Sequence, residues 1–206
     1  CSIGVFDIKT HAEFVPLATS SAWNFQQGSS ISWLNKRTLF FNVLKEGFAR
    51  GSTVDIIDRT VEVRKYPCTS ISKDGLVGVA PNFVALNKLG RRGYSYACSR
   101  SDSSDLFECE LKFIDVVKDY CIREIGVREI KGVEPRLENV SHIYLEHPQI
   151  SPSGARCLFL ARYRLPDGGI SSSLFIYDLR DDFISSVIVD GRIGHFNWID
   201  DASFVF

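Results

Sequence analysis

The chain has 206 residues, of which 45% are hydrophobic and 24% are charged, and its formal net charge is −1 at pH 7. These values are ordinary for a globular domain, and they create no general field that would attract nucleic acid or an anionic membrane. No apolar run approaches the length of a membrane span. No positively charged segment leads into an apolar stretch as in a signal peptide, which favours the cytoplasm over the periplasm and leaves the compartment open.

Short strands with alternating apolar and polar residues are predicted along the whole chain. In chain order they cover residues 4–8, 13–17, 30–34, 38–42, 53–58, 61–66, 69–72, 76–80, 106–111, 119–125, 148–151, 156–161, 174–178, 183–189, 195–199 and 203–206. The third strand of a group often closes on an acidic residue, as at Asp58 and Asp178.

A phrase of two strands joined by a polar turn occurs four times. Its turns lie at Asn35-Lys36, Lys73–Gly75, Pro152–Gly154 and Asp200-Asp201. A repeat of roughly 40 residues built from short strands and polar turns is the signature of a β-propeller. The sequence therefore predicts an all-β fold of four-stranded antiparallel blades, with about four blades in one partial domain over residues 1–206. Because both ends fall in predicted strands, we expect a piece of a longer protein.

The spacing between the second and third turns, from Asp74 to Gly154, is twice the repeat length. We interpret this stretch as one blade with insertions at about 84–104 and 127–143, while two degenerate blades are the alternative. Pro135 limits any helix in the second insertion, because proline has no N–H to donate inside a helix.

The long loops are predicted to converge on one mouth of the central channel. In a propeller the first strand of each blade is innermost, and the loops between strands two and three lie on the same face as the loops between blades. Both insertions are of these two kinds, and so are loops 23–28, 162–169 and 191–195.

The first candidate binding loop combines an aromatic ring with amides. Trp23 offers a flat apolar face, and Asn24, Gln26 and Gln27 offer paired donors and acceptors for sugar hydroxyls. The alternative is a structural loop whose Trp fills the space between blades.

The first insertion carries a basic and aromatic motif. Arg91 and Arg92 stand between glycines and can approach a carboxylate, sulfate or phosphate closely. Tyr94 and Tyr96 follow, and a Tyr beside an Arg can act as a general acid or base. A solvated basic turn with packing tyrosines is the alternative.

Three histidines lie in segments that lead to the mouth. His142 is in a loop between blades, and His195 begins the last innermost strand. His147 and Gln149 are two residues apart, so they share one side of their strand. With His195 they could bind a divalent ion such as Mn²⁺. Histidines hydrogen-bonded between blades are the alternative.

Arg162 and Arg164 are predicted to share one side of a strand that points to the mouth. They could form an anion clamp, or they could be members of ion pairs between blades.

Glu146 and Asp167 are candidate carboxylates that nothing distinguishes from surface acids. Cys109 and Cys121 could form a disulfide across a hairpin, with free buried thiols as the alternative. The sequence has no G-x-S-x-G elbow, P-loop or dinucleotide fingerprint.

Four motifs carry a family resemblance over nearly the whole chain: Trp23–Gly28, Gly93–Tyr96, His147–Gly154 and Gly194–Trp198. They resemble a bacterial group of propeller proteins that is similar to the seven-bladed oligogalacturonate lyases and, more loosely, to TolB-type propellers. The resemblance implies a parent protein about twice this long. It also implies β-elimination on acidic oligosaccharides, with Mn²⁺ held by histidines and a Gln, of which His147, Gln149 and His195 are the matching positions.

Two functional hypotheses follow. In the first, the mouth binds an acidic oligosaccharide, with Trp23, Asn24, Gln26, Gln27, Tyr96 and Trp198 as contacts. His142 or Tyr94 would be the base, and Arg91, Arg92 and Arg162 would neutralise the carboxylate. In the second, the chain is a non-catalytic TolB- or WD-like scaffold that binds a glycan or a protein segment.

Overall fold

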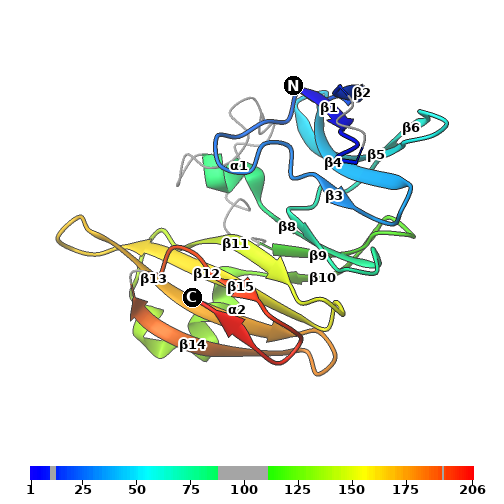
Figure 1. The fold of residues 1–206 in the computed structure, drawn as a ribbon. Coiled ribbons are helices and arrows are strands. Elements are labelled where there is room, and N and C mark those ends of the chain that lie inside the picture. Colours follow the sequence, from blue (N-terminus) through cyan, green and yellow to red (C-terminus); the bar gives the residue numbers. More distant parts are fainter. Residues whose placement is uncertain (10–12, 88–110, 192) are drawn as a thin grey trace.

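The computed structural model describes residues 1–9, 13–87, 111–191 and 193–206. Within those ranges the strands form antiparallel sheets whose strands follow one another in chain order (Figure 1). The strands are β1 (Ser2–Val5), β2 (Val15–Thr19), β3 (Ser32–Trp33), β4 (Thr38–Lys45), β5 (Phe48–Asp55), β6 (Val61–Arg64), β7 (Ser70–Ile71), β8 (Val77–Pro81), β9 (Leu111–Asp115), β10 (Tyr120–Ile125), β11 (Tyr144–Ile150), β12 (Arg156–Arg164), β13 (Ile170–Asp178), β14 (Phe183–Gly191), β15 (Asn197–Trp198) and β16 (Phe204–Val205).

Three of these sheets are four-stranded, and we name them blade I (β3–β6), blade II (β7–β10) and blade III (β11–β14). The pair β1-β2 forms an N-terminal half-blade, and the pair β15-β16 forms a C-terminal half-blade. The predicted all-β fold of four-stranded antiparallel blades is therefore confirmed.

Helices occur only in two connections of the described chain. The short helix α1 (Phe83–Ala85) follows β8, and α2 (Val127–Val133) with the 3₁₀ helix η3 (Pro135–Leu137) connects β10 to β11. Helix α2 ends before Pro135, as proline geometry requires. None of the described helices has the length and apolar character needed to cross a membrane.

Several predicted strand positions were wrong. Strand β11 begins at Tyr144 rather than at 148, and β13 begins at Ile170 rather than at 174. Strand β5 begins at Phe48 rather than at 53, because Glu46 and Gly47 take positive φ angles of 54° and 82° and turn the chain in two residues. The third strand of blade II is described at Leu111–Asp115, beyond the end of the prediction at 106–111. Residues 106–110 lie outside the described residues.

Each blade is buried on both faces, so its strands are apolar on both sides. In β4, Leu39 and Phe41 pack against the N-terminal half-blade, whereas Phe40 between them packs against blade II. In β12, Leu158 packs toward the C-terminal half-blade and Phe159 toward blade II. Burying each such side chain stabilises the fold by roughly 1.5–3 kcal/mol.

A buried amide joins the N-terminal half-blade, blade I and blade II. The Asn42 side chain in β4 is fully buried; its Nδ2 donates to Cys68 O at 2.8 Å, and its Oδ1 accepts from Cys68 N at 3.0 Å. The Asn42 carbonyl accepts from Ser20 Oγ at 2.5 Å. A buried amide with donor and acceptor both satisfied fixes how the blades meet.

The turn after the third strand of each blade has a recurring form. Asp55, Asp115 and Asp178 each end that strand, and each carboxylate accepts backbone N–H bonds from the turn. Four residues later, the backbone has positive φ at Arg59, Asp119 and Asp182. Of the two acidic residues noted in the sequence, Asp178 therefore shapes this turn, whereas in blade I this is done by Asp55, and Asp58 lies within the turn.

In blades II and III, the residue with positive φ binds the preceding blade. Asp119 accepts from Lys65 N at 2.7 Å, and Asp182 accepts from Arg123 Nε at 3.0 Å. The hydrogen bond from Tyr177 and the bond from Arg123 lower the pKa of Asp182. Each contact joins the outer strand of one blade to the next blade along the chain.

The described cysteines carry free thiols: Cys1, Cys68, Cys121 and Cys157. Cys68 and Cys157 are buried, and burial raises the pKa of both thiols well above the ordinary value. Cys109 lies outside the described residues, while its predicted partner Cys121 is half-buried in β10.

Replacing Asn42 should loosen the junction between the blades. We expect Asn42→Ala to lower the free energy of unfolding by about 2–4 kcal/mol, because two buried backbone groups of Cys68 lose their partner. Urea unfolding followed by tryptophan fluorescence measures this. The control, Asn139→Ala, changes an exposed amide and should cost less than about 0.5 kcal/mol. Equal losses for both variants would contradict the role of Asn42.

Replacing the glycine in the turn between β7 and β8 should destabilise the fold for two separable reasons. Gly75 has φ +76°, and an added Cβ would lie 2.5 Å from Leu34 O of blade I. We expect Gly75→Ala to cost about 2–4 kcal/mol, from backbone strain plus the steric clash. Thermal unfolding measures the loss.

Two other glycines separate these causes. Gly168 has φ +85° with nothing near its Cβ position, so Gly168→Ala should cost only about 1 kcal/mol. Gly132 lies in α2 with open space, and Gly132→Ala should stabilise the chain by up to about 1 kcal/mol. If Gly75→Ala lowered the free energy of unfolding no more than Gly168→Ala, the close approach of the blades at Gly75 would make no contribution to the loss.

Candidate functional site

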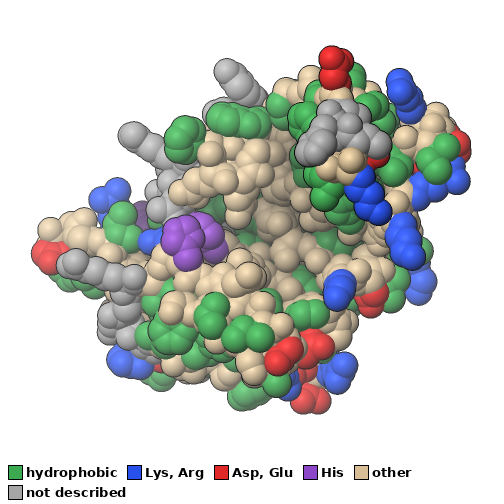
Figure 2. Space-filling view, in the orientation of Figure 1, with side chains coloured by type: hydrophobic (Ala, Val, Ile, Leu, Met, Phe, Trp, Pro, Cys, Tyr) green, Lys and Arg blue, Asp and Glu red, His purple; other side chains and the backbone are tan. Residues whose placement is uncertain are grey.

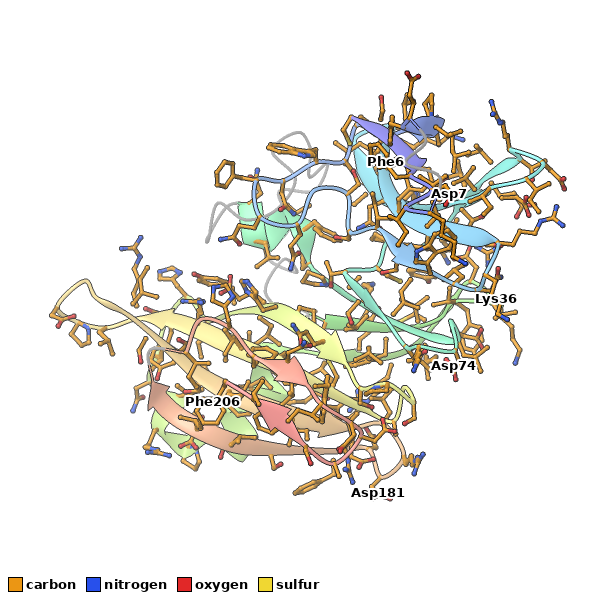
Figure 3. The ribbon with its side chains drawn as sticks, viewed as in Figure 1. Phe6, Asp7, Lys36, Asp74, Asp181 and Phe206 are labelled. Atoms are coloured by element: carbon orange, nitrogen blue, oxygen red, sulfur yellow. The ribbon has the colours of Figure 1, made fainter. Side chains whose placement is uncertain are left out.

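The loops sort onto two ends of the blades. Figure 3 labels Lys36, Asp74 and Asp181, which lie in turns between strands one and two or between strands three and four, and all three fall on one side of the view. Helix α1 and the β12–β13 hairpin extend to the opposite side in Figure 1. The described start of the connection after β8 and the β12–β13 hairpin therefore lie toward the same end of the blades.

A groove runs along the innermost strands β7, β11 and β15, and we call it the channel groove. It has a volume of about 420 Å³. Figure 2 shows histidine side chains beside the hollowed centre of this face. The lining residues are Gln27, Thr69, Ser70, Ile71, Lys73, His147, Pro148, Gln149, Ile150, Pro152, Asn197 and Trp198.

Lys73 also lines a second, shallower hollow with Trp33, Leu34, Asn35 and Lys36, of about 530 Å³. The described residues that line these two hollows include amides, hydroxyls, two lysines and two Trp rings, but no Asp or Glu. Such a lining favours an anionic ligand with hydrogen-bonding groups.

The Trp23–Gly28 loop is organised by the Asn24 side chain. Asn24 Oδ1 accepts from Gln26 N at 3.0 Å and from Gln27 N at 2.7 Å, and its backbone exchanges two hydrogen bonds with Gly28. Asn24 is buried, so its side-chain oxygen accepts hydrogen bonds from the loop itself and does not face solvent. The loop is thereby held in one shape before any ligand arrives.

This loop presents two aromatic rings to solvent. Trp23 is 52% exposed and Phe25 is 91% exposed, and their rings meet edge to face at 6.5 Å. Trp23 therefore does not fill the space between blades. Gln27 reaches the channel groove, and Gln26 lies beside it near His147.

A buried ion pair lies at the mouth end of β11. Glu146 is 1% exposed, and its carboxylate pairs with Arg162 on the neighbouring strand β12. Arg162 also donates from Nη2 to Ile193 O at 3.4 Å. The Arg162 guanidinium is thus engaged within blade III rather than presented to the groove as an anion clamp.

His147 follows this ion pair in an unusual backbone conformation. Its φ is +51°, and the pairing of β11 with β12 is irregular between Glu146 and Gln149. A bulge with positive φ at a residue other than glycine stores strain and re-aims the side chains around it. His147 Nδ1 lies 3.3 Å from Glu146 Oε1, without the alignment of a hydrogen bond.

Gln149 and Trp198 are tied together through the backbone. Trp198 Nε1 donates to Gln149 O at 2.9 Å, and the Trp198 ring packs against Phe204 at 5.8 Å. This bond fixes the C-terminal half-blade against blade III while Trp198 still lines the groove. Gln149 Oε1 is buried and has no hydrogen-bond partner among the described residues.

The residues predicted to hold Mn²⁺ are brought together in part. The rings of His147 and His195 are 6.4 Å apart and perpendicular, and Gln149 contributes an unpartnered amide oxygen nearby in the same groove as His147. Imidazole and amide donors are suitable ligands for a divalent ion. Within the described residues, however, no group of three or more His, Cys, Asp or Glu side chains is arranged to hold a metal.

Of the remaining predicted catalytic residues, His142 is described and lies apart from this cluster. His142 is exposed in the connection before β11, with φ +58°. Arg91, Arg92, Tyr94 and Tyr96 lie outside the described residues.

The sequence analysis missed several residues on the groove, among them Thr69, Ser70 and Lys73. Their signal is their position in the second copy of the repeat phrase, where the first strand of a blade lines the channel. Glu146 was indistinguishable from a surface acid, because its burial depends on the pairing of β11 with β12.

No family model matches the chain, and no curated protein matches it. Among solved structures it is similar to TolB from Acinetobacter baumannii, with a TM-score of 0.50 and 11% identity over 91% of this chain and 38% of that one. Two further similar structures are the tricorn protease (TM-score 0.49, 10% identity, 81% and 13%) and an uncharacterized protein from Listeria monocytogenes EGD-e (0.45, 13%, 87% and 44%).

The chain thus spans less than half the length of each of these structures. At such low identity the likeness to TolB shows the fold alone, and together with the blades described above it defines the chain as part of a β-propeller. The closer resemblance to the oligogalacturonate lyases stays a prediction.

The buried pair of Glu146 and Arg162 should show strong coupling. We expect Glu146→Leu or Arg162→Met alone to cost about 3–5 kcal/mol, because each leaves a buried charge unpaired, and the double variant to cost less than their sum. The exposed pair of Lys112 and Glu124, at 2.6 Å, is the control, with a coupling below about 1 kcal/mol. Equal coupling energies in the two double-mutant cycles, both measured by unfolding, would contradict a special role for the buried pair.

Proposed function

We propose that the channel groove binds an acidic oligosaccharide. The observation that carries this proposal is the described lining of the groove and of the shallower hollow beside it, which has amides, hydroxyls, Lys73 in both and Lys36 in the hollow, but no acidic side chain. The lysines would attract the carboxylates of uronic acids, and the amides would exchange hydrogen bonds with sugar hydroxyls.

The shape of the groove supports an extended ligand. The two hollows share Lys73, so a ligand that passes over this lysine could contact Trp33 on β3 and Trp198 on β15. The ordered loop with exposed Trp23 adds an aromatic face at the mouth, where a sugar ring can stack. Because Asn24 holds this loop in place, little ordering entropy would be lost on binding.

Cleavage by β-elimination is a second candidate function, favoured by the unpartnered Gln149 oxygen and the two facing histidine rings. A bound Mn²⁺ would stabilise negative charge on the substrate carboxylate. His147, Gln149 and His195 are the proposed ligands. His142 or Tyr94 would take the proton next to the carboxylate, and Arg91 and Arg92 would neutralise charge.

Binding should depend on charge in the groove. We expect tetragalacturonate to bind in calorimetry and uncharged maltotetraose not to bind. Lys73→Ala should weaken binding about fivefold, since a near-surface charge pair contributes roughly 1 kcal/mol. Lys118→Ala, an exposed lysine outside the groove, should leave affinity unchanged. If neither sugar binds, the non-catalytic protein scaffold becomes the better hypothesis.

Cleavage is measured separately, by the ultraviolet absorbance of the unsaturated product, with Mn²⁺ and with a chelator. An increase that requires Mn²⁺ and disappears in His147→Ala supports the lyase. Binding without any increase in absorbance would refute cleavage and leave the binding proposal intact.

A further inference from the structure

A second pocket lies between blades I and II, away from the channel groove. We call it the interblade pocket, and its volume is about 360 Å³. It is bounded by the β4–β5 hairpin, the segment after β6, the β8–α1 connection and one residue of β9. The lining residues are Gly47, Phe48, Ala49, Arg50, Lys65, Tyr66, Pro67, Ala80, Pro81, Asn82, Phe83, Val84 and Lys112.

The floor of the interblade pocket is apolar and well packed. Phe83 and Ala80 are buried, in a cluster with Ala22 that Leu44 and Ala49 complete. Tyr66 and Phe48 add aromatic walls, and Phe48 is 39% exposed. The walls are held close together, because a Cβ at Gly51 would lie 2.4 Å from Tyr66 O. The pocket therefore offers a preformed site for a ring or an aliphatic group.

The rim of this pocket is cationic. Arg50 Nη1 donates to Lys65 O at 2.9 Å, which fixes the guanidinium at the rim, and Arg50 lies over the Phe48 ring at 5.8 Å. Lys65 Nζ lies over the Tyr66 ring at 4.9 Å. Among the described residues, neither cation has a carboxylate within ion-pair distance, whereas Lys112 pairs with Glu124. No described residue of the lining is acidic.

An apolar floor beneath unpaired cations selects a ligand that joins a carboxylate to an apolar body. We propose that the interblade pocket binds an aromatic carboxylate, with the ring against Phe48, Tyr66 and Phe83 and the carboxylate at Arg50 and Lys65. Arg can bind a carboxylate with two parallel hydrogen bonds, and the low polarity of the floor strengthens the attraction. This site is separate from the channel groove, because the two share none of their described lining residues.

The same chemistry can come from a free aromatic acid or from a peptide that ends in Phe with a free C-terminal carboxylate. The volume is within the range of small-ligand sites, about 300–1,000 Å³, and suits either source. The recognition elements are identical in both cases, namely one ring and one carboxylate a short distance apart.

The experiment uses 3-phenylpropionate as the probe and 3-phenylpropanamide as its uncharged counterpart, with binding followed by NMR titration of the whole chain. We expect the acid to bind at least about fivefold tighter than the amide. Arg50→Met and Lys65→Met should each weaken the acid about threefold to tenfold while leaving the amide unchanged. Lys118→Met is the matched control and should change nothing.

Three further measurements keep the proposal open to refutation. Tetragalacturonate should not displace the acid, because the two sites are separate. Acetyl-Gly-Gly-Phe should bind tighter than 3-phenylpropionate if the source is a peptide terminus, and no tighter if it is a free acid. Equal binding of acid and amide, or no binding by a chain whose thermal unfolding is normal, would overturn the proposal, as would displacement by tetragalacturonate.

Discussion

The structure depends on the burial of each blade between two neighbours. Since both faces of a sheet such as β3–β6 lose contact with water, consecutive residues like Leu39 and Phe40 must both be apolar, although they point in opposite directions. Any polar side chain at such a junction needs its own partner there. Asn42 meets this requirement with two bonds to the Cys68 backbone, and so hydrophobic burial and hydrogen bonding enforce the same alignment of blades I and II.

The same constraint places the candidate site. Packing fixes the inner strands, and the irregular pairing of β11 then turns His147 toward the groove while Glu146 stays buried against Arg162. Strain at His147 is tolerated because the residues before and after it in β11 are paired with β12. The groove therefore combines a rigid frame with a local departure from regular strand geometry, which is the arrangement that binding sites on β-sheet scaffolds commonly use.

Sequence patterns predicted the repeat and the four-stranded blades, because turns and alternation are local properties. They missed the start of β5, since the turn at Glu46-Gly47 has only two residues and these are not the pair most typical of hairpin turns. They could not predict the pairing of Glu146 with Arg162 or the use of the Asn24 oxygen, which depend on strand register and loop closure. The interblade pocket could not be predicted from the sequence either, because four separate segments form its walls.

The bonds made by Asp119 and Asp182 have a consequence for how the molecule transmits change. Each carboxylate receives donors from the outer strand of the blade just before it. Communication between blades is consequently a relay between immediate neighbours. A shift at the wall shared by blades I and II can therefore pass to blade III through blade II. Pro81 and Phe83 of the interblade pocket also line a small hollow with Gln27 and His147 of the channel groove, so a ligand in one pocket borders the residues that hold a ligand in the other.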